Sequence, residues 1–130
     1  MKTIVLGICG SIAAIRAFDL VRVLRKKGFS VQVLMSKGAE GIITKDAMEW
    51  ASGNSVITQI TGKVEHVKFF GKKGKADLMI IAPATANTIS KIAMAIDDTP
   101  ITTFATIAIG SKKPVLIAPA MHEPMYEHPI

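Results

Sequence analysis

Residues 78–88, with the sequence LMIIAPATANT, decide the fold of this chain. The first five residues form a continuous apolar run, which is typical of a strand buried on both faces of a parallel sheet. We expect the strand to stop at Pro83, because proline has no N–H group to donate to a neighbouring strand. Residues 114–125, PVLIAPAMHEPM, repeat the same plan: an apolar strand, an Ala-Pro pair and a loop of small or polar residues.

Apolar runs at 3–6 and 31–35 predict two more strands, and a short strand is predicted near 56–57. Helical spacing of apolar residues predicts helices over about 12–27, 45–51, 87–95 and 100–109, the first ending at Gly28. This alternation predicts an α/β fold, a Rossmann-like (flavodoxin-like) open parallel sheet with helices on both faces. With 130 residues, 49% of them hydrophobic, we expect one domain, 1–130.

Composition excludes several classes of protein. The only cysteine, Cys9, rules out an intrachain disulfide framework and a cysteine-based zinc site, so we expect no metal. No uncharged run approaches the ~20 residues of a membrane span. A net charge of +6 with only 5% aromatic residues favours an anionic small molecule over nucleic acid. We expect a cytoplasmic protein with no membrane or nucleic-acid partner.

Ligands of open parallel sheets bind beyond the carboxyl ends of the strands, which selects four loops here. The first contains Gly7, Gly10 and Ser11. It is either a phosphate site at a helix start or an ordinary serine-capped turn. The second has Ser36 and Lys37 where an NAD site would have an acidic residue, so it favours a mononucleotide such as FMN. The alternative is that Ser36 caps a helix and Lys37 is a surface residue.

The third and fourth loops supply further candidates. Asn87 is either a group facing a ring edge or the cap of the following helix. His66 and His122 are candidate proton-exchanging groups, although a lone histidine is more often structural. Met121 and Met125 could cover a flat ligand or simply pack in the core.

Taken together, these loops resemble the homo-oligomeric flavin-containing cysteine decarboxylases. PATANT at 83–88 is similar to the family's PASANT motif, and PAMHEPMY at 119–126 is similar to its PxMNxxMW motif. GSIAA at 10–14 resembles its flavin-binding turn, and His66 stands where the family has its active-site histidine. Within the family, the chain most resembles the phosphopantothenoylcysteine decarboxylase part of archaeal-type bifunctional coenzyme A biosynthesis proteins.

The resemblance implies FMN-dependent decarboxylation of 4′-phosphopantothenoylcysteine to 4′-phosphopantetheine. It implies His66 as the catalytic residue, and His122 and Met125 as substrate-binding residues. For the FMN phosphate and ribityl chain it implies Gly10, Ser11, Ile12 and Ser36. For the isoalloxazine ring it implies Thr85, Ala86, Asn87, Thr88 and Ala120. The family forms trimers, or dodecamers of trimers, with FMN at a subunit interface, so a neighbouring chain would supply part of each site, His66 being one candidate.

The chain also departs from the family pattern. His122 replaces an asparagine, and the family's downstream substrate flap with its proton-donating cysteine does not follow residue 130. One interpretation is a domain truncated at its C-terminus; the others are a naturally short flavoprotein and a degenerate paralogue that binds FMN without full turnover. Alternative readings are a flavin prenyltransferase, a peptidyl-cysteine decarboxylase, a dipicolinate synthase subunit, or an FMN-binding subunit without catalysis.

Overall fold

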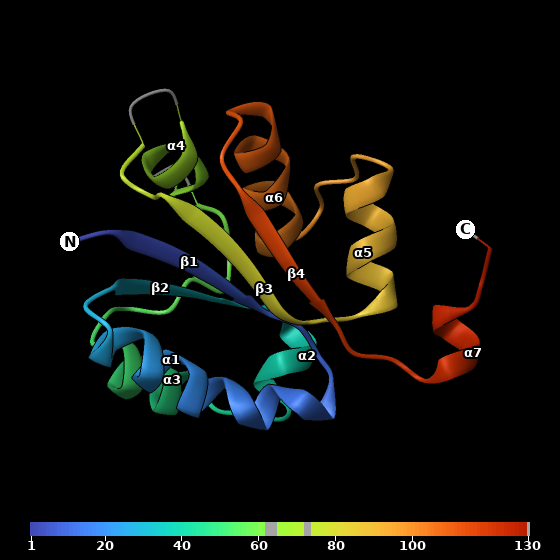
Figure 1. Cartoon of the computed structure of the whole chain (residues 1–130), viewed down its shortest axis with the longest axis horizontal. Helices are drawn as coiled ribbons and strands as arrows, with labels where there is room; N and C mark the ends of the chain where they lie inside the picture. Colours follow the sequence, from blue (N-terminus) through green and yellow to red (C-terminus); the bar gives the residue numbers. More distant parts are fainter. Residues whose placement is uncertain (62–64, 72–73, 130) are drawn as a thin grey trace.

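A computed structural model describes residues 1–61, 65–71 and 74–129, and its described part contains one four-stranded sheet. The strand order is β2-β1-β3-β4, and every neighbouring pair is parallel. The predicted open parallel sheet is therefore confirmed (Figure 1). The strands are β1 (Thr3–Ile8), β2 (Ser30–Met35), β3 (Leu78–Ala84) and β4 (Val115–Pro119).

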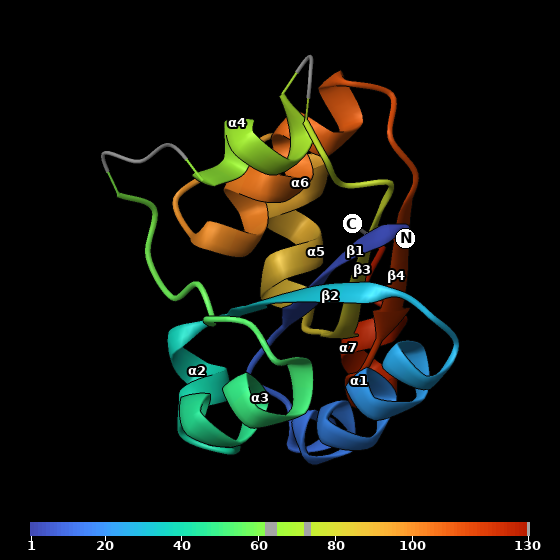
Figure 2. The same ribbon diagram turned by 90° about the vertical axis from the view of Figure 1, so that its left-hand side faces the viewer.

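Helices cover both faces of the sheet, as the alternation of strands and helices predicts. Helices α1 and α3 lie on one face, while α4, α5 and α6 lie on the other (Figures 1 and 2). The helical segments are η1 (Ile12–Arg16), α1 (Ala17–Lys26), α2 (Lys37–Glu40), α3 (Lys45–Ser52), α4 (Glu65–Phe70), α5 (Ala86–Ala93), α6 (Pro100–Gly110) and α7 (Glu123–Tyr126). None of the helices in the described residues is long and apolar enough to cross a bilayer.

Two apolar clusters form because successive side chains of a strand point to opposite faces. Ile4, Leu6 and Ile8 of β1 join the cluster that includes residues of α1 and α3. Val5 of β1 joins the opposite cluster, which contains residues of α4 and α6. The continuous apolar run of β1 is thus explained, since both of its faces are buried.

Helix α6 approaches the sheet closely at Gly7. A Cβ atom at Gly7 would lie 3.2 Å from Cγ2 of Ile101, so a larger side chain there would push against the first turn of α6. Thr99 caps this helix with a capping box, and Pro100 fills its first turn, where no donor is needed. Phe104 is fully buried and contacts the rings of Phe69 and Phe70 at centroid distances of 6.0 and 6.2 Å.

Several local predictions need correction. The helix predicted over 12–27 is a 3-10 turn, η1, followed by α1, because apolar spacing does not distinguish i+3 from i+4 hydrogen bonding. The strand predicted near 56–57 is only one isolated bridge between Leu34 and Ile57. The short helices α2, α4 and α7 have four to six residues each and were not predicted, since such lengths carry little periodicity.

The second Ala-Pro pair ends its strand as predicted, but the first does not. Strand β3 continues through Pro83 to Ala84, with a register shift between Ile81 and Ala84, and β4 ends on Pro119 itself. Pro83 lacks a donor, but its carbonyl accepts a hydrogen bond from the N–H of Cys9 at 3.1 Å. The chain beyond Ile81 therefore stays attached to the first loop.

Replacing Phe104 with alanine should lower the free energy of unfolding by about 3–5 kcal/mol, because it empties a fully buried aromatic site. Ile109→Ala is the matched control on the same helix, since the Ile109 side chain is 53% exposed. That control should change stability by about 0.5 kcal/mol or less. Urea denaturation followed by circular dichroism measures both, and equal effects would contradict this assignment of the core.

Candidate functional site

A cavity of about 580 Å³ lies beyond the carboxyl ends of β1, β3 and β4. Its volume is ordinary for a cofactor site, and its position is where parallel α/β sheets bind ligands. Three separate segments of sequence supply its walls. The lining residues are Gly10, Ser11, Ile12, Ala13, Thr85, Ala86, Ala120, Met121, His122 and Met125.

The first wall is the turn between β1 and η1. Ser11 caps η1, and its Oγ accepts a hydrogen bond from the N–H of Ala13 at 3.2 Å. Since η1 leads directly into α1, the positive end of a helical segment faces this wall. Gly10 is pressed against the second loop, because a Cβ atom there would lie 3.0 Å from the Gly38 backbone. Only glycine allows these two loops to approach so closely.

The second wall is the start of α5. Thr85 is the N-cap, and its Oγ1 accepts a hydrogen bond from the N–H of Thr88 at 3.3 Å. Asn87 is therefore not the helix cap, which corrects one of its two readings; it is exposed beside the cavity wall formed by Thr85 and Ala86. Thr88 points inward and is buried, so its side chain supports the wall from behind.

Cys9 joins the first two walls. Its backbone N–H donates to Pro83 O at 3.1 Å, and its Sγ donates to Thr88 Oγ1 at 3.3 Å. Thr88 Oγ1 also accepts from Thr85 Oγ1 at 3.2 Å, which extends the link to the N-cap of α5. The Cys9 side chain is 1% exposed. Sequence reasoning did not identify this role, because spacing alone does not show that residues 9 and 88 meet.

The third wall follows β4. The N–H of Ala120 donates to Ala84 O at 3.0 Å, which fixes the start of this loop against the end of β3. His122 occupies the N-cap position of α7 without a side-chain capping bond, so its imidazole is available to a ligand. A second, more apolar cavity of about 510 Å³ adjoins the first and shares Ala86, Met121 and Met125 with it. Its other lining residues are Ile89, Ser90, Pro119, Tyr126 and His128.

The structure thus brings together most of the site residues named from the sequence, but four lie outside the cavity lining. Asn87 and Thr88 belong to the wall segment without lining it. Ser36 caps α2, its Oγ accepting from the N–H of Ala39 at 3.2 Å. Its own N–H donates to Ile8 O at 3.1 Å, at the end of β1, and the following Gly38 contacts Gly10. His66 lies on α4, which packs against α6 on the other face of the sheet from α1.

His66 has an unusual environment for a residue outside the cavity. Its Nδ1 atom is buried and has no hydrogen-bond partner among the described residues. A buried polar atom without a partner is costly, so this ring is suited to a partner that one copy of the described chain does not supply. In the same described ranges, no three His, Cys, Asp or Glu side chains converge as a metal site would require.

Comparisons with known proteins agree on the family. The protein-family model described as "Flavoprotein" matches residues 1–130. The coenzyme A biosynthesis bifunctional protein CoaBC of Thermococcus kodakarensis is 55% identical over 130 residues, which is 99% of this chain and 32% of that protein. The chain therefore spans about a third of the length of this bifunctional relative.

A shorter relative and a solved structure match as well. The probable phosphopantothenoylcysteine decarboxylase of Streptococcus mutans is 36% identical over 131 residues, covering 99% of this chain and 73% of that protein. The crystal structure of the FMN-dependent cysteine decarboxylase SpaF superposes with a TM-score of 0.84 at 27% identity. The match covers 99% of this chain and 74% of that one.

Replacing Thr88 with valine should destabilise the protein by about 1–2 kcal/mol, because it leaves the buried Cys9 thiol without its acceptor. Ser90→Ala is the control on the same helix, since Ser90 is exposed. It should change the free energy of unfolding by about 0.5 kcal/mol or less. Guanidinium denaturation measures the stability of both variants. A midpoint for Thr88→Val equal to that of the unmutated protein would show that the link between Cys9 and Thr88 does not stabilise the fold.

Proposed function

The chain belongs to the Flavoprotein family, and on that premise we propose that residues 1–130 form a domain that binds FMN and decarboxylates 4′-phosphopantothenoylcysteine to 4′-phosphopantetheine. One observation carries the proposal: the segments that hold the family motifs, 10–14, 83–88 and 119–126, close around a single cavity. The matches to CoaBC and to a probable phosphopantothenoylcysteine decarboxylase support this substrate. We also propose a cytoplasmic location, in keeping with a step of coenzyme A biosynthesis.

The residues of the cavity suit FMN. Gly10, Ala86 and Ala120 are small, so a flat ring can approach the backbone on both sides. The start of η1 beside Ser11 and Ile12 offers backbone N–H groups and a hydroxyl to a phosphate. Ser36 precedes Gly38, which touches Gly10, and this contact supports a role for Ser36 at the phosphate or ribityl chain. Thr85, Asn87 and the buried Thr88 shape the wall for the ring.

The protein contributes positioning and electrostatics to this reaction. When bound, FMN supplies the oxidation and reduction that make loss of CO₂ from a cysteinyl carboxylate feasible. His122 is exposed at the cavity and free of capping, so we assign it to the substrate carboxylate. Met121 and Met125 line both adjoining cavities, so we assign Met125 to packing against the substrate. The excess of positive charge on the chain favours a phosphorylated substrate.

We propose that His66 acts in a neighbouring subunit of a homo-oligomer, a trimer or a dodecamer of trimers. In one chain His66 does not line the cavity, and α4 lies far from α7 (Figure 1). Its Nδ1 has no partner among the described residues, which supports a role completed by a group outside this copy. Two chains together would then form one site.

The alternative activities share the same cavity and differ in substrate. A peptidyl-cysteine decarboxylase would release CO₂ from a peptide ending in cysteine, and a prenyltransferase would alkylate the flavin instead. A dipicolinate synthase subunit or a binding subunit would bind FMN and release no CO₂ from either cysteine compound. Assaying CO₂ release from phosphopantothenoylcysteine and from a cysteine-terminated peptide separates these outcomes, and the proposal requires the former substrate to be strongly preferred.

Gly10→Ala should weaken FMN binding about tenfold or more, which corresponds to about 1.4 kcal/mol, because the added methyl forces the two loops apart. The matched control is Gly41→Ala, whose Cβ atom would meet its nearest neighbour at an ordinary 3.5 Å. Titrations of flavin fluorescence give both dissociation constants. Equal affinities for the two variants would place the flavin elsewhere.

His66→Asn should abolish CO₂ release while the protein still binds FMN, because His66 lies outside the cavity lining. Co-assembly with the Gly10→Ala variant tests the neighbouring-chain assignment. If each site combines one chain's cavity with the next chain's His66, random mixed oligomers contain about a quarter of intact sites. Activity in the mixture, with neither variant active alone at the same FMN concentration, is the expected result. No recovery would place both residues in one chain's site.

A further inference from the structure

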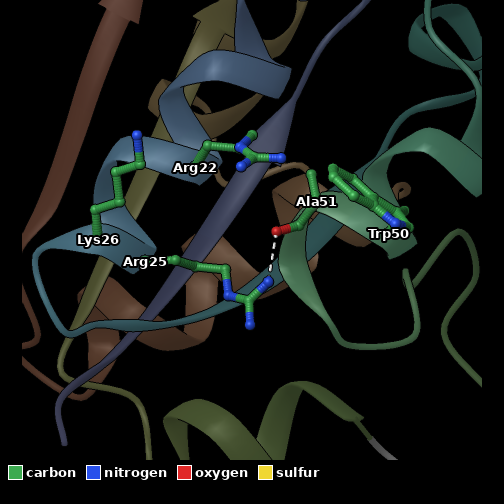
Figure 3. A pocket seen from close by; sticks show the side chains of 5 residues that line it. All are labelled: Arg22, Arg25, Lys26, Trp50 and Ala51. Carbon is green, nitrogen blue, oxygen red and sulfur yellow. Dashed lines mark hydrogen bonds between the residues drawn. The ribbon is translucent and has the colours of Figure 1, made fainter.

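A third hollow, of about 500 Å³, lies between α1 and α3, and it shares no lining residue with the two adjoining cavities at the sheet edge. It is lined by Arg22, Arg25, Lys26, Trp50 and Ala51. Figure 3 shows the two guanidinium groups extending from α1 toward the end of α3. Three cations from one helix thus border a single concave surface.

Arg25 is fixed in place by the C-terminal end of α3. Its Nη1 donates to Ala51 O at 2.9 Å, as the dashed line in Figure 3 shows. The guanidinium also packs against Gly53, where a Cβ atom would lie 3.2 Å from Nη2. This bond satisfies a helix-terminal carbonyl, which is a structural role. It uses one of the five N–H groups of the side chain, so the remaining donors are held in a defined orientation.

Arg22 lies against the indole of Trp50. Its Cζ atom lies 5.0 Å from the ring centroid, a cation–π contact, and the indole stacks in parallel on Phe18 with centroids 5.9 Å apart. Trp50 therefore serves as a platform for the guanidinium rather than as a stacking surface for a base. The side chain of Trp50 is nevertheless 66% exposed, which is unusual for a residue of this size.

None of the three cations has a carboxylate within ion-pair distance among the residues that the structure describes. Arg22 precedes Arg25 by three residues and Lys26 by four, so the like charges stand on neighbouring positions of one helix. Such pairs destabilise a helix by about 0.2–0.5 kcal/mol each. The helix dipole favours cations in the last turn, which accounts for Arg25 and Lys26 but leaves Arg22 without that explanation.

We propose that this hollow binds a small, multiply charged phosphate anion, such as pyrophosphate or the polyphosphate end of a nucleotide. Guanidinium groups recognise phosphate oxygens through paired N–H donors, and two such groups are already oriented here. Fixing them beforehand reduces the entropy lost on binding. The proposal does not depend on the flavin function, because the hollow is separate from the flavin cavity.

The position of Trp50 provides a direct test, because it is the only tryptophan of the chain. The purified protein is saturated with FMN, which fills the flavin cavity, and is titrated with inorganic pyrophosphate while tryptophan emission is followed. We expect a saturable change in emission. The double variant Arg22→Gln/Lys26→Gln should raise the dissociation constant at least tenfold, and calorimetry checks this independently of the emission of Trp50.

A matched control removes the same charge elsewhere. Lys112 and Lys113 lie in the turn between α6 and β4. The double variant Lys112→Gln/Lys113→Gln should change the dissociation constant for pyrophosphate less than twofold. Equal weakening by both double variants would overturn the proposal, because binding would then follow net charge alone. Lys26→Gln makes the test independent of the Arg22–Trp50 contact, and it should weaken binding by itself.

The ligand class is tested by comparison. The dissociation constant for adenosine diphosphate should lie within threefold of that for pyrophosphate, because Phe18 and Arg22 already contact the indole ring and a base would gain little by stacking there. Adenosine, which has no phosphate, should not bind. Saturable binding of a polyglutamate peptide without binding of pyrophosphate would overturn the proposal in favour of an acidic protein partner. If FMN fails to bind but the pyrophosphate response persists in the unmutated chain and is lost in Arg22→Gln/Lys26→Gln, the flavin function fails and this site stands.

Discussion

The parallel alignment of β1, β3 and β4 is the constraint on which the site depends. It brings three loops that are far apart in the sequence to one edge of the sheet. The alignment must persist past the prolines for the loops to meet, and it does so through carbonyl acceptors: Pro83 O accepts from Cys9, and Ala84 O accepts from Ala120. The cavity is therefore a consequence of strand pairing, with the loops adding chemistry to an edge that the sheet has already defined.

Residues that support the cavity are distinct from those that face it. Cys9 and Thr88 are buried behind the walls, whereas Ser11, Thr85 and Ala86 line the space in front of them. Loss of a supporting residue should first appear as lost stability, and loss of a lining residue as lost affinity. His66 fits neither group, because it is partly buried on α4 and lies outside the lining. Within the ranges that the structure describes, its Nδ1 has no hydrogen-bond partner.

The strands and long helices could be predicted because their apolar residues are continuous or periodic. The end of α3 at Gly53 could also be predicted, because glycine readily adopts the left-handed conformation that ends many helices, here with a φ of 72°. The link between Cys9 and Thr88 could not be predicted, since it depends on a contact across 79 residues. Thr85 rather than Asn87 caps α5. Strand β3 continues to Ala84, and α5 begins at Ala86, one residue before the start that the apolar spacing predicted. The hollow at Trp50 was also missed, because it requires α1 and α3 to pack side by side.

The visible absorption spectrum of the purified protein, recorded after incubation with FMN and removal of free flavin by gel filtration, tests the central claim most directly. The account predicts a yellow protein that retains about one oxidised flavin per chain and elutes as an oligomer. A colourless protein that retains no flavin would contradict the claim that the three loops at the carboxyl edge of the sheet form a flavin site.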